Sequence, residues 1–571
     1  MDSIKKPARH FVAENIEIRW ENIYPYFQSL LDEELQTLEG IEHWMLKRSE
    51  LESILEEDFA WRYIRMTCDT SNETLQQEFE YFATEIEPKL AEYGNKLNEK
   101  ILNAPNFKDL SEEKYGIYLR ALKNQYELFR EENIPLFTEL QIEQQKYGAI
   151  VGAMSIEYKG QTYTLEQASN FLKDGDREVR REVYELIQQR RMQDKNALNS
   201  LFDKLLTVRH QVALNAGFEN FRDYMFKALG RFDYGVEDCY SFHEAIEKGL
   251  MPTMKNLAEA RKQALKLDTL RPYDGEVDVT GKPALKPFDG AEELINKSIR
   301  TFEKIDSSFG TKLRLMKEHG LLDLESRMNK APGGYNYPLA ETGAPFIFMN
   351  SANAMRDLTT MVHEGGHAIH TFLSKDLLLN DFKHTPSEVA EVASMSMELI
   401  SMDAWDEFFN SDEELTRAKE EQLKDCLKTL PWVACIDAFQ HWLYTNPGHT
   451  HAAREEKWIS LSNTYGGQFI DWSGYEEFQK YQWQKQLHLF EVPFYYIEYA
   501  IAQLAAIAIY KNYKADKGKT LDQYKAALTL GYTKSIPEIY AAAGIRFDFS
   551  ADYIQSLVKF VEKELKDLTH A

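Results

Sequence analysis

The chain has 571 residues, of which 43% are hydrophobic and 28% are charged, and its formal net charge is −25. This composition is typical of a large globular protein and excludes a disordered one. The acidic excess argues against a nucleic-acid partner, because a phosphate backbone is bound by clustered Lys and Arg. Gly and Pro number only 28 and 17, which favours long, uninterrupted helices.

The cysteines and the apolar runs indicate in which cellular compartment the protein is expected. Cys68, Cys239, Cys426 and Cys435 are scattered without a CxxC pair, so they form neither a disulfide framework nor a zinc knuckle. The first twenty residues lack the apolar core of a signal peptide, and the longest apolar run near the C-terminus, residues 500–510, is too short for a membrane span. We expect a soluble, cytoplasmic protein with no membrane partner, and the oligomeric state stays open.

The first part of the chain has a helical pattern. Residues 16–102 repeat apolar residues at three- and four-residue steps, which predicts paired long helices with solvated charged faces. Residues 155–164 predict a hairpin that turns at Lys159-Gly160. Thr164 and Gln167 then predict a capping box at the start of the next helix.

The middle of the chain is less regular. Residues 267–290 carry several Gly and Pro and indicate a loop. Residues 330–353 have turn residues at both ends and an apolar strand at residues 345–350. The sequence therefore predicts a mainly α protein with a small sheet near its middle.

Residues 357–373, DLTTMVHEGGHAIHTFL, carry the clearest functional motif. On a helical wheel one apolar stripe gathers Leu358, Met361, Val362, Ile369, Phe372 and Leu373. His363 and His367 lie one turn apart and point away from that stripe, so both imidazoles can reach one small cation. The order H-E-x-x-H places Glu364 beside such an ion without ligating it. A chance match on an amphipathic helix is the alternative.

The donor types indicate zinc and a hydrolytic role. Zinc in a catalytic site takes three protein ligands and a water, whose pKa falls from about 15.7 to about 7. Glu364 is then placed to take the proton of that water and pass it to a leaving amine. The sequence does not exclude Mn or Co as the working metal.

A second helix offers a third ligand. Thr385 is a good N-cap, Pro386 suits the first helical position, and Glu388 completes T-x-x-E. On this helix Glu391 and Glu398 are seven residues apart, two turns along one face. Glu391 completes a His2Glu set for one Zn²⁺ ion, with 24 residues of chain after His367 for a turn and a returning helix. Glu398 either orients one of the histidines or faces solvent.

Gly365, Gly366 and His370 lie within the same motif. The glycines either let a neighbouring backbone or peptide approach the metal face closely, or allow tight helix–helix packing. One helix offers only two convenient ligands, so we expect a structural hydrogen bond from His370.

Four blocks in order resemble one family. HEGGH, EVASMSMEL downstream, FIFMN upstream and HLFEVPFYYIEYAIAQ near the C-terminus together resemble the oligoendopeptidase F branch of the thimet-oligopeptidase family of zinc metallopeptidases. The likeness covers roughly residues 155–565. It implies a two-lobed helical shell around a deep channel with zinc on its floor, in which residues 1–190 form part of the channel wall and residues 191–571 form the catalytic domain. It also implies cleavage of short peptides and exclusion of folded proteins.

The resemblance assigns roles to individual residues. His363, His367 and Glu391 match the ligands and Glu364 matches the base. The family commonly has HEFGH, so Gly365 departs from its pattern and puts the local packing in doubt, but not the chemistry.

The C-terminal block has two interpretations. Tyr496 and Tyr499 match family tyrosines that reach the substrate carbonyl or backbone, and His488 matches a histidine beside them. The match slips by about one residue before Pro493, which makes His488 the less certain. A tyrosine hydroxyl stays protonated at neutral pH and can donate to an oxyanion. The alternative is that these aromatic residues fill a core.

Residues 331–350 also allow two interpretations. The block is a Gly-rich turn before a strand, or the free edge of that strand pairs with an extended peptide. In the second case Gly333, Gly334 and Tyr335 touch the substrate or gate the channel.

The leading hypothesis is a zinc endopeptidase that cleaves internal bonds of short oligopeptides. A zinc carboxypeptidase or dipeptidyl carboxypeptidase would need a cationic group closing one end of the channel, and no Arg or Lys stands out near the motifs. A non-catalytic, zinc-containing peptide-binding protein is a further alternative, although such a protein has no use for Glu364.

Overall fold

The computed structural model describes residues 4, 6–331 and 333–570. The chain divides into two compact units, each assembled from three segments. Unit 1 comprises Met1–Glu127, Leu285–Gln422 and Ala502–Phe547, and unit 2 comprises Leu128–Ala284, Leu423–Ile501 and Asp548–Ala571. The predicted division at residues 190 and 191 stays a prediction.

Unit 1 holds most of the long N-terminal helices and a three-stranded sheet. Its elements are α1 (Trp20–Asp32), α2 (Leu38–Cys68), α3 (Glu73–Tyr81), η1 (Phe82–Ile86), α4 (Glu87–Leu102), α5 (Glu112–Leu128), α13 (Ala291–Ile305), α14 (Ser307–Glu318), β3 (Leu322–Glu325), β4 (Tyr335–Leu339), β5 (Ala344–Ser351), α15 (Met355–Ser374), α16 (Ser387–Ile400), α22 (Lys517–Thr529) and α23 (Ile536–Ala542).

Within its described residues, unit 2 has one hairpin and is otherwise built from helices and loops. Its elements are α6 (Ile134–Gly152), β1 (Ser155–Tyr158), β2 (Gln161–Thr164), α7 (Leu165–Ser169), α8 (Arg177–Gln193), α9 (Lys195–Asn215), α10 (Phe221–Ala228), α11 (Val236–Ala245), η5 (Ile246–Leu250), α12 (Met251–Ala264), α18 (His451–Thr464), α19 (Glu476–Lys480), α20 (Leu487–Glu491) and α24 (Ala551–His570). Two further helices, α17 (Asp412–Thr445) and α21 (Ile497–Ala515), each contribute residues to both units.

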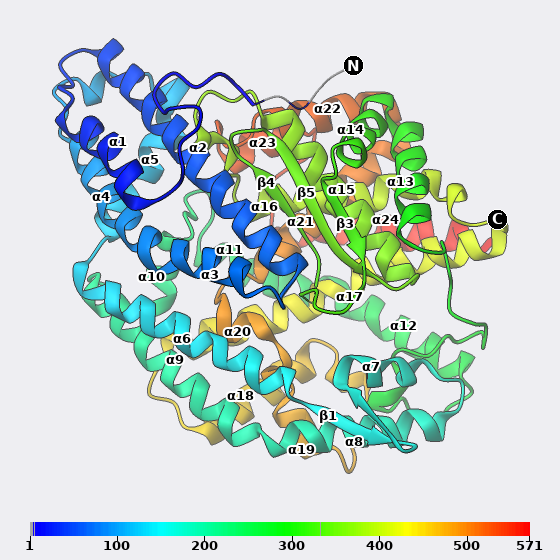
Figure 1. Cartoon of the computed structure of the whole chain (residues 1–571). Helices are drawn as coiled ribbons and strands as arrows, with labels where there is room; N and C mark the ends of the chain where they lie inside the picture. The colour runs from blue at the N-terminus through cyan, green and yellow to red at the C-terminus, as the bar shows by residue number, and fades with distance from the viewer. Residues whose placement is uncertain (1–3, 5, 332, 571) are drawn as a thin grey trace. The chain divides into compact units, whose positions relative to one another are not determined.

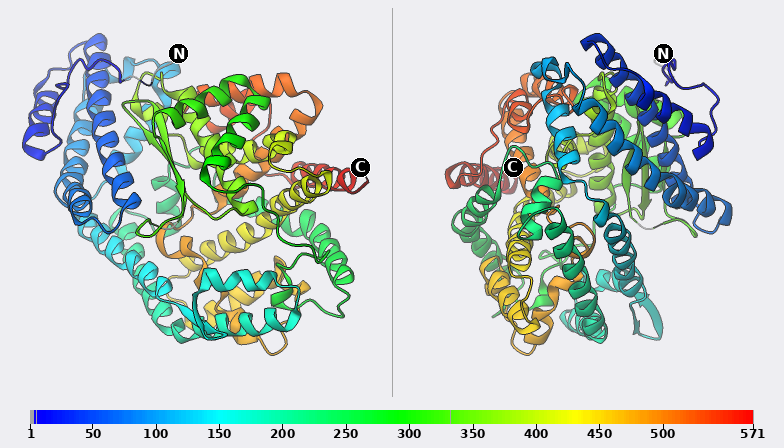
Figure 2. Two further views of the ribbon diagram at one scale, coloured as in Figure 1. Left: turned by 45° about the vertical axis from the view of Figure 1, so that its right-hand side comes forward. Right: turned by 90° about the vertical axis from the view of Figure 1, so that its left-hand side faces the viewer.

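The N-terminal helices of unit 1 confirm the helical pattern of residues 16–102. Helix α1 packs against α2 and α4 (Figure 2). Their apolar residues form one buried core in which the Trp44 side chain is completely buried. Trp44 Nε1 donates to the Leu30 carbonyl at 2.9 Å, so the indole is buried with its polar group satisfied.

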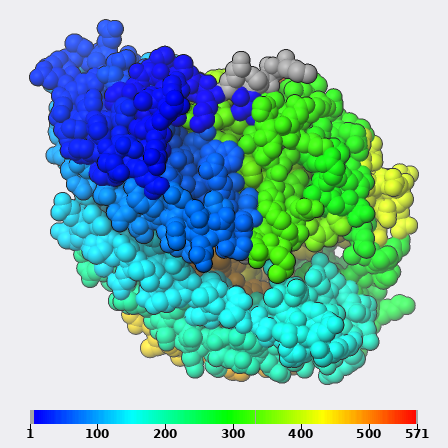
Figure 3. Space-filling view, in the orientation of Figure 1, coloured from blue at the N-terminus to red at the C-terminus, as the bar shows by residue number. Residues whose placement is uncertain are grey.

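The three-stranded sheet has the order β3-β5-β4 (Figure 1). The central strand β5 runs parallel to β3 and antiparallel to β4, with Tyr335 opposite Phe348 and Leu339 opposite Ala344. Helix α15 packs on β5, and α2 packs on β4. Figure 3 shows the second contact at the surface, where side chains of the N-terminal helices (blue) meet those of the sheet region (green). The predicted small sheet beside the motif helix is confirmed.

Two local predictions in unit 2 are confirmed. The hairpin is confirmed, with Tyr158 opposite Gln161, and Lys159 and Gly160 form its turn at φ 50° and 76°. The capping box of Thr164 and Gln167 is also confirmed. The loop at residues 267–290 contains one short 3₁₀ turn, η6 (Pro272–Asp274).

The predicted N-cap of the second motif helix is wrong by one residue. Helix α16 begins at Ser387, and Pro386 rather than Thr385 occupies the cap. The φ of −54° at Pro386 would suit a helix, but its ψ of 149° is extended, so this residue precedes the first turn. Its carbonyl accepts hydrogen bonds from the backbone N–H groups of Val389 and Ala390, at 2.9 and 3.0 Å.

The observed protein is mainly α-helical with two small sheets within its described residues, and the predicted fold class is confirmed in this respect. Within the same residues, every helix is too short or too polar to cross a membrane.

Candidate metal centre

Helix α15 places the two motif histidines on its partly exposed face. The six apolar residues of the predicted stripe are buried, apart from Leu373, which is half-buried. His363 and His367 are half-buried on another face, and their ring centroids are 4.9 Å apart. The helix starts where the Asp357 side chain accepts the backbone N–H of Ala354 at 2.9 Å. Burial of the stripe therefore fixes the direction in which both imidazoles point.

Helix α16 brings Glu391 to the two histidines. Its Oε2 atom lies 3.3 Å from His363 Nε2 and 3.7 Å from His367 Nε2. One ligand atom from each of the three residues lies within 4.8 Å of the others. Both ring nitrogens face the same carboxylate oxygen, so a cation between them would meet two imidazoles and one carboxylate. This donor set fits zinc, which takes nitrogen and oxygen ligands of these kinds.

Glu398 contacts the histidine on its other side. His363 Nδ1 lies 2.7 Å from Glu398 Oε1, and Gln422 Nε2 donates to Glu398 Oε2 at 2.7 Å. Glu398 is therefore not a solvent-facing residue. A carboxylate on Nδ1 holds the ring with Nε2 directed at Glu391, the arrangement that metal-ligating histidines commonly have.

The carboxylate of Glu391 has a second anchor on its own helix. Ser394 Oγ donates to Glu391 Oε2 at 3.0 Å. Gln422 and Ser394 are parts of the site that the sequence did not identify. The spacing of three residues between Glu391 and Ser394 on one helix could have indicated their contact. Nothing in the sequence indicated that Gln422 would reach Glu398.

Charge and burial act in opposite directions on these groups. Burial favours the neutral form of both histidines, and it lowers the pKa of His367 to about 4. For His363 the hydrogen bonds to Glu391 and Glu398 outweigh burial and hold its pKa well above the usual value. Burial would raise the pKa of Glu391, but its contact with His363 brings the value down to about 2.

Glu364 lies beside this group and has a different environment. Glu364 is only 7% exposed, and its backbone carbonyl accepts a hydrogen bond from Asn336 Nδ2 of β4 at 3.2 Å. Burial raises the pKa of its carboxyl to about 7. A carboxyl with that pKa exchanges a proton readily near neutral pH.

Close packing inside unit 1 leaves no room for a side chain at either glycine of the motif. A Cβ on Gly366 would lie 2.6 Å from Ala393 O and from Ser394 Cα, both backbone atoms of α16. A Cβ on Gly365 would lie 2.4 Å from Cζ of Phe302, on α13. Gly366 thus lets the α16 backbone approach closely. The Phe302 ring occupies the space beside position 365, where the resembling family commonly has its own phenylalanine.

The expected hydrogen bond of His370 is not present at Nε2. This atom is buried and has no hydrogen-bond partner among the described residues. Burial lowers the pKa of His370 to about 3. The ring is therefore a neutral imidazole packed in the core behind the metal face.

Residues 333–335 lie at the start of β4. Gly333 has φ 97°, a conformation that favours glycine, and its carbonyl accepts Asn350 Nδ2 at 3.0 Å. The Tyr335 ring stacks on Phe348 at 4.8 Å, and its hydroxyl lies 2.6 Å from Thr67 Oγ1. The aromatic side chain is therefore held between the sheet and α2.

The predicted free strand edge needs correction. Strand β5, which contains residues 345–350, is paired on both sides, so it has no edge for a peptide. The outer position next to it belongs to β4. A strand with an uninterrupted apolar run, such as residues 344–349 here, is typical of a central position, and this signal was present in the sequence.

The aromatic residues of the C-terminal block form a cluster within unit 2. The His488 ring lies 4.7 Å from that of Tyr496 and 5.8 Å from that of Tyr499. Gln486 Nε2 lies 2.7 Å from His488 Nδ1, and Trp432 Nε1 donates to Gln486 Oε1 at 3.0 Å. Burial lowers the pKa of His488 to about 4, so the ring is neutral at physiological pH.

The backbone before these tyrosines is strained. Phe494 has φ 67°, which is rare for a bulky residue. Gln440 Oε1 accepts its backbone N–H at 2.6 Å, and the Arg231 guanidinium donates to its carbonyl. These two buried contacts hold the turn from which Tyr495 and Tyr496 follow.

Comparisons with known proteins agree with one another. A family model described as Peptidase family M3 matches residues 170–559, and one described as Peptidase M3 N-terminal domain matches residues 15–129. An oligoendopeptidase F homolog of Borreliella burgdorferi is 25% identical over 479 residues, which cover 78% of this chain and 75% of that protein. The chromosomal oligoendopeptidase F of Lactococcus lactis subsp. cremoris is 23% identical over 403 residues, which cover 70% and 65%.

Solved structures resemble the whole fold. A structure described as PZ peptidase A with inhibitor 2 has a TM-score of 0.88 and 26% identity, covering 96% of this chain and 97% of that one. A putative oligoendopeptidase F has a TM-score of 0.89 and 26% identity, covering 98% and 99%.

Proposed function

We propose that this chain, which belongs to peptidase family M3 and is a metallo-oligopeptidase, cleaves internal bonds of short peptides with one zinc ion held by His363, His367 and Glu391. The observation that carries the proposal is the approach of Glu391 Oε2 to both imidazole Nε2 atoms, at 3.3 and 3.7 Å. Glu364, next to the first ligand in sequence, supplies the proton-transfer group.

In the proposed mechanism the zinc ion activates the water and the side chains of the protein transfer the proton. Zinc bound here would lower the pKa of a water molecule to about 7 and polarise the scissile carbonyl. The Glu364 carboxylate accepts the proton of the attacking water and delivers it to the leaving amine nitrogen. Burial favours the protonated form of the Glu364 carboxyl, which suits delivery of the proton in the second half of this transfer. Glu398 keeps the His363 ring in the tautomer that presents Nε2.

We assign the developing oxyanion to the tyrosine hydroxyls. Burial raises the pKa of Tyr496, so its hydroxyl remains protonated and able to donate. Tyr499 has the same chemistry, and His488, whose ring lies close to both, supports them as a neutral imidazole. This assignment rests on the family resemblance and on donor chemistry.

For substrate recognition we propose that an extended peptide pairs with the outer edge of β4, beside the Gly333-Gly334 turn. Backbone pairing of this kind recognises the main chain, which accounts for tolerance of many side chains. Asn336 of β4 already bonds the Glu364 carbonyl, so an added strand would run next to the proposed base. We further propose that folded proteins are excluded.

We also propose a cytoplasmic location. The four cysteines, all within the described part of the chain, form no disulfide, which suits a reducing compartment.

Replacement of the base tests the mechanism. Glu364→Gln keeps the shape and polarity of the side chain but cannot accept the proton, so kcat should fall about 10²- to 10⁴-fold. Zinc content and peptide affinity should stay unchanged. Asp376→Asn, which alters an exposed carboxylate just beyond α15, is the matched control and should keep full turnover. Unchanged cleavage by the Glu364→Gln variant would refute the assignment.

Product analysis separates endopeptidase from carboxypeptidase action. Peptides of graded length should yield internal fragments whose cut position does not follow the C-terminus. Release of only one or two C-terminal residues from every peptide would favour the carboxypeptidase alternatives.

A further inference from the structure

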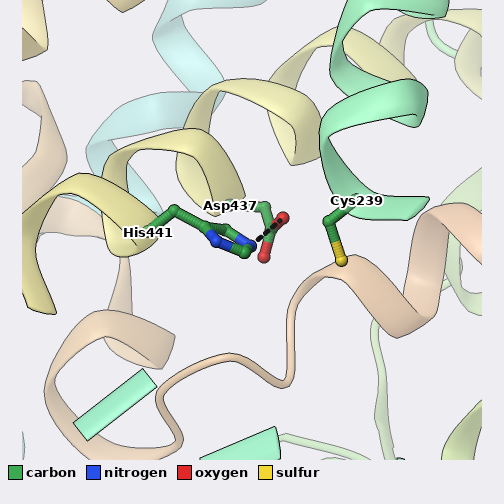
Figure 4. A group of neighbouring side chains, drawn as sticks. All are labelled: Cys239, Asp437 and His441. Atoms are coloured by element: carbon green, nitrogen blue, oxygen red, sulfur yellow. Dashed lines mark ion pairs between the residues drawn. The ribbon is translucent and has the colours of Figure 1, made fainter. Parts of the chain in front are cut away.

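A second group of metal-ligand side chains lies buried in unit 2. Cys239 of α11 and Asp437 and His441 of α17 each offer one ligand atom, and these atoms lie within 4.8 Å of one another. Figure 4 shows the three side chains projecting from the two helices toward one another. All three residues are buried, and Asp437 is completely inaccessible.

Several polar atoms of this group lack partners. Asp437 Oδ1 and both ring nitrogens of His441 form no hydrogen bond within the described parts of the chain. His441 Nε2 lies 3.3 Å from Asp437 Oδ2, which is close enough for an ion pair. Buried polar atoms without partners are rare because each loses its hydration without compensation. A cation between the carboxylate and the imidazole would satisfy both.

The other carboxylate oxygen is already anchored. His243 Nε2, from α11, lies 2.8 Å from Asp437 Oδ2. This contact leaves Oδ1 as the atom available to a ligand. A histidine that holds a carboxylate from behind is a common support for a metal ligand.

We propose that Cys239, Asp437 and His441 bind a second divalent cation of the zinc class, in addition to the ion of the candidate metal centre. Coordination deprotonates the thiol, so thiolate and carboxylate together balance the charge of the ion. A set of sulfur, nitrogen and oxygen donors selects zinc-like ions over Mg²⁺ and Ca²⁺, which prefer oxygen alone. No spacing of residues indicated this group in advance, because Cys239 and Asp437 lie almost two hundred residues apart.

The geometry requires only a small adjustment. Zinc–ligand distances of about 2.0 to 2.3 Å in a tetrahedron place neighbouring ligand atoms about 3.5 Å apart. The three atoms, which lie within 4.8 Å of one another, would therefore draw together by about 1.3 Å at most. A water would complete the coordination.

The position of this group indicates a bracing role. The ion would tie α11 to α17 next to the strained residue Phe494, whose ring lies 5.5 Å from that of His441. The residue before His441, Gln440, accepts the Phe494 backbone N–H. An ion at this place would stabilise the turn that precedes Tyr496 and Tyr499. The inference does not depend on the proposed peptidase mechanism, because it concerns a different group of residues.

Metal content and cobalt spectroscopy test the proposal. Purified wild-type protein should hold two zinc-class ions per chain by elemental analysis, and Cys239→Ser should hold one. After replacement by Co²⁺, wild-type protein should show a sulfur-to-cobalt charge-transfer band in the near ultraviolet. The residues of the candidate metal centre include no sulfur, so this band reports the second site alone.

The matched control is Cys435→Ser, which alters another buried cysteine on α17 and should keep both the band and two ions. Loss of the band in Cys239→Ser but not in Cys435→Ser supports the proposal. One ion per chain in the wild-type protein, or a cobalt form without the band, would overturn it. These two wild-type measurements decide the question even if a variant fails to fold.

Discussion

The close approach of α15 and α16 at Gly366 leads to a quantitative prediction. An alanine Cβ at this position would lie 2.6 Å from Ala393 O and Ser394 Cα. Ordinary contact requires about 3.5 Å, so the two helices must separate locally by about 0.9 Å. The obstacle is backbone, and no side chain can rotate away. Overpacking of this kind destabilises a protein by about 1–3 kcal/mol.

The separation should also disturb the metal centre, because α15 carries both histidines and α16 carries Glu391. Misplacement of a reacting group by about 1 Å can lower kcat/KM about 10²-fold. Gly366→Ala should therefore melt earlier, hold zinc more weakly and cleave peptides about 10²-fold less efficiently. The assays are denaturation, elemental analysis and steady-state kinetics with a quenched peptide.

Gly365→Ala is the informative comparison. Its Cβ would meet the Phe302 ring rather than backbone, so Phe302→Leu should relieve part of the strain. The double variant should be less destabilised than the sum of its single changes. A Gly366→Ala protein with wild-type melting, zinc content and activity would refute the argument that this contact sets the distance between the helices.

Three further predictions concern other groups. Glu398→Ala removes the partner of His363 Nδ1, and zinc affinity, measured by competition with a chelator, should fall about 10- to 100-fold; unchanged affinity would contradict its supporting role. Tyr499→Phe should lower kcat about 10²-fold in peptide kinetics, whereas Tyr495→Phe serves as a control that keeps activity. Asp274→Asn leaves the buried Arg180 without its carboxylate and should lower the free energy of unfolding by about 3 kcal/mol at neutral pH. Burial would raise the pKa of Asp274, but hydrogen bonds from Arg177 and Arg180 outweigh it and lower the pKa. The ionised Asp274 therefore contributes to the stability of the fold above the pKa of an unfolded aspartate, about 3.9. The difference in the free energy of unfolding between variant and wild type should shrink as the pH falls below that value. A pH-independent difference in denaturation would count against this account.

The sequence predicted those features that depend on residues near one another in the chain. The steps of three and four residues in residues 16–102 indicated helices, and the Lys159-Gly160 turn indicated the hairpin. His363 and His367 share a helix face because four residues make about one turn. Glu391 and Glu398 share a face for the same reason.

Contacts between distant segments could not be read from the sequence in this way. The sequence left open whether Glu398 faces solvent or a histidine, and only the packing of α16 on α15 decided between them. It predicted a free edge for residues 345–350, but strands on both sides occupy that position. It predicted a hydrogen bond for His370, whose buried Nε2 has no hydrogen-bond partner among the described residues.

The sequence by itself determined the helical character of the chain and the face on which the motif histidines lie, because both follow from the repeat of a single helix. The tertiary structure alone decided why Gly365 and Gly366 are glycines, since one meets Phe302 of α13 and the other the backbone of α16. It also brought Cys239 together with Asp437 and His441. Distances across a helix interface depend on how whole surfaces pack, and no local spacing of residues encodes them.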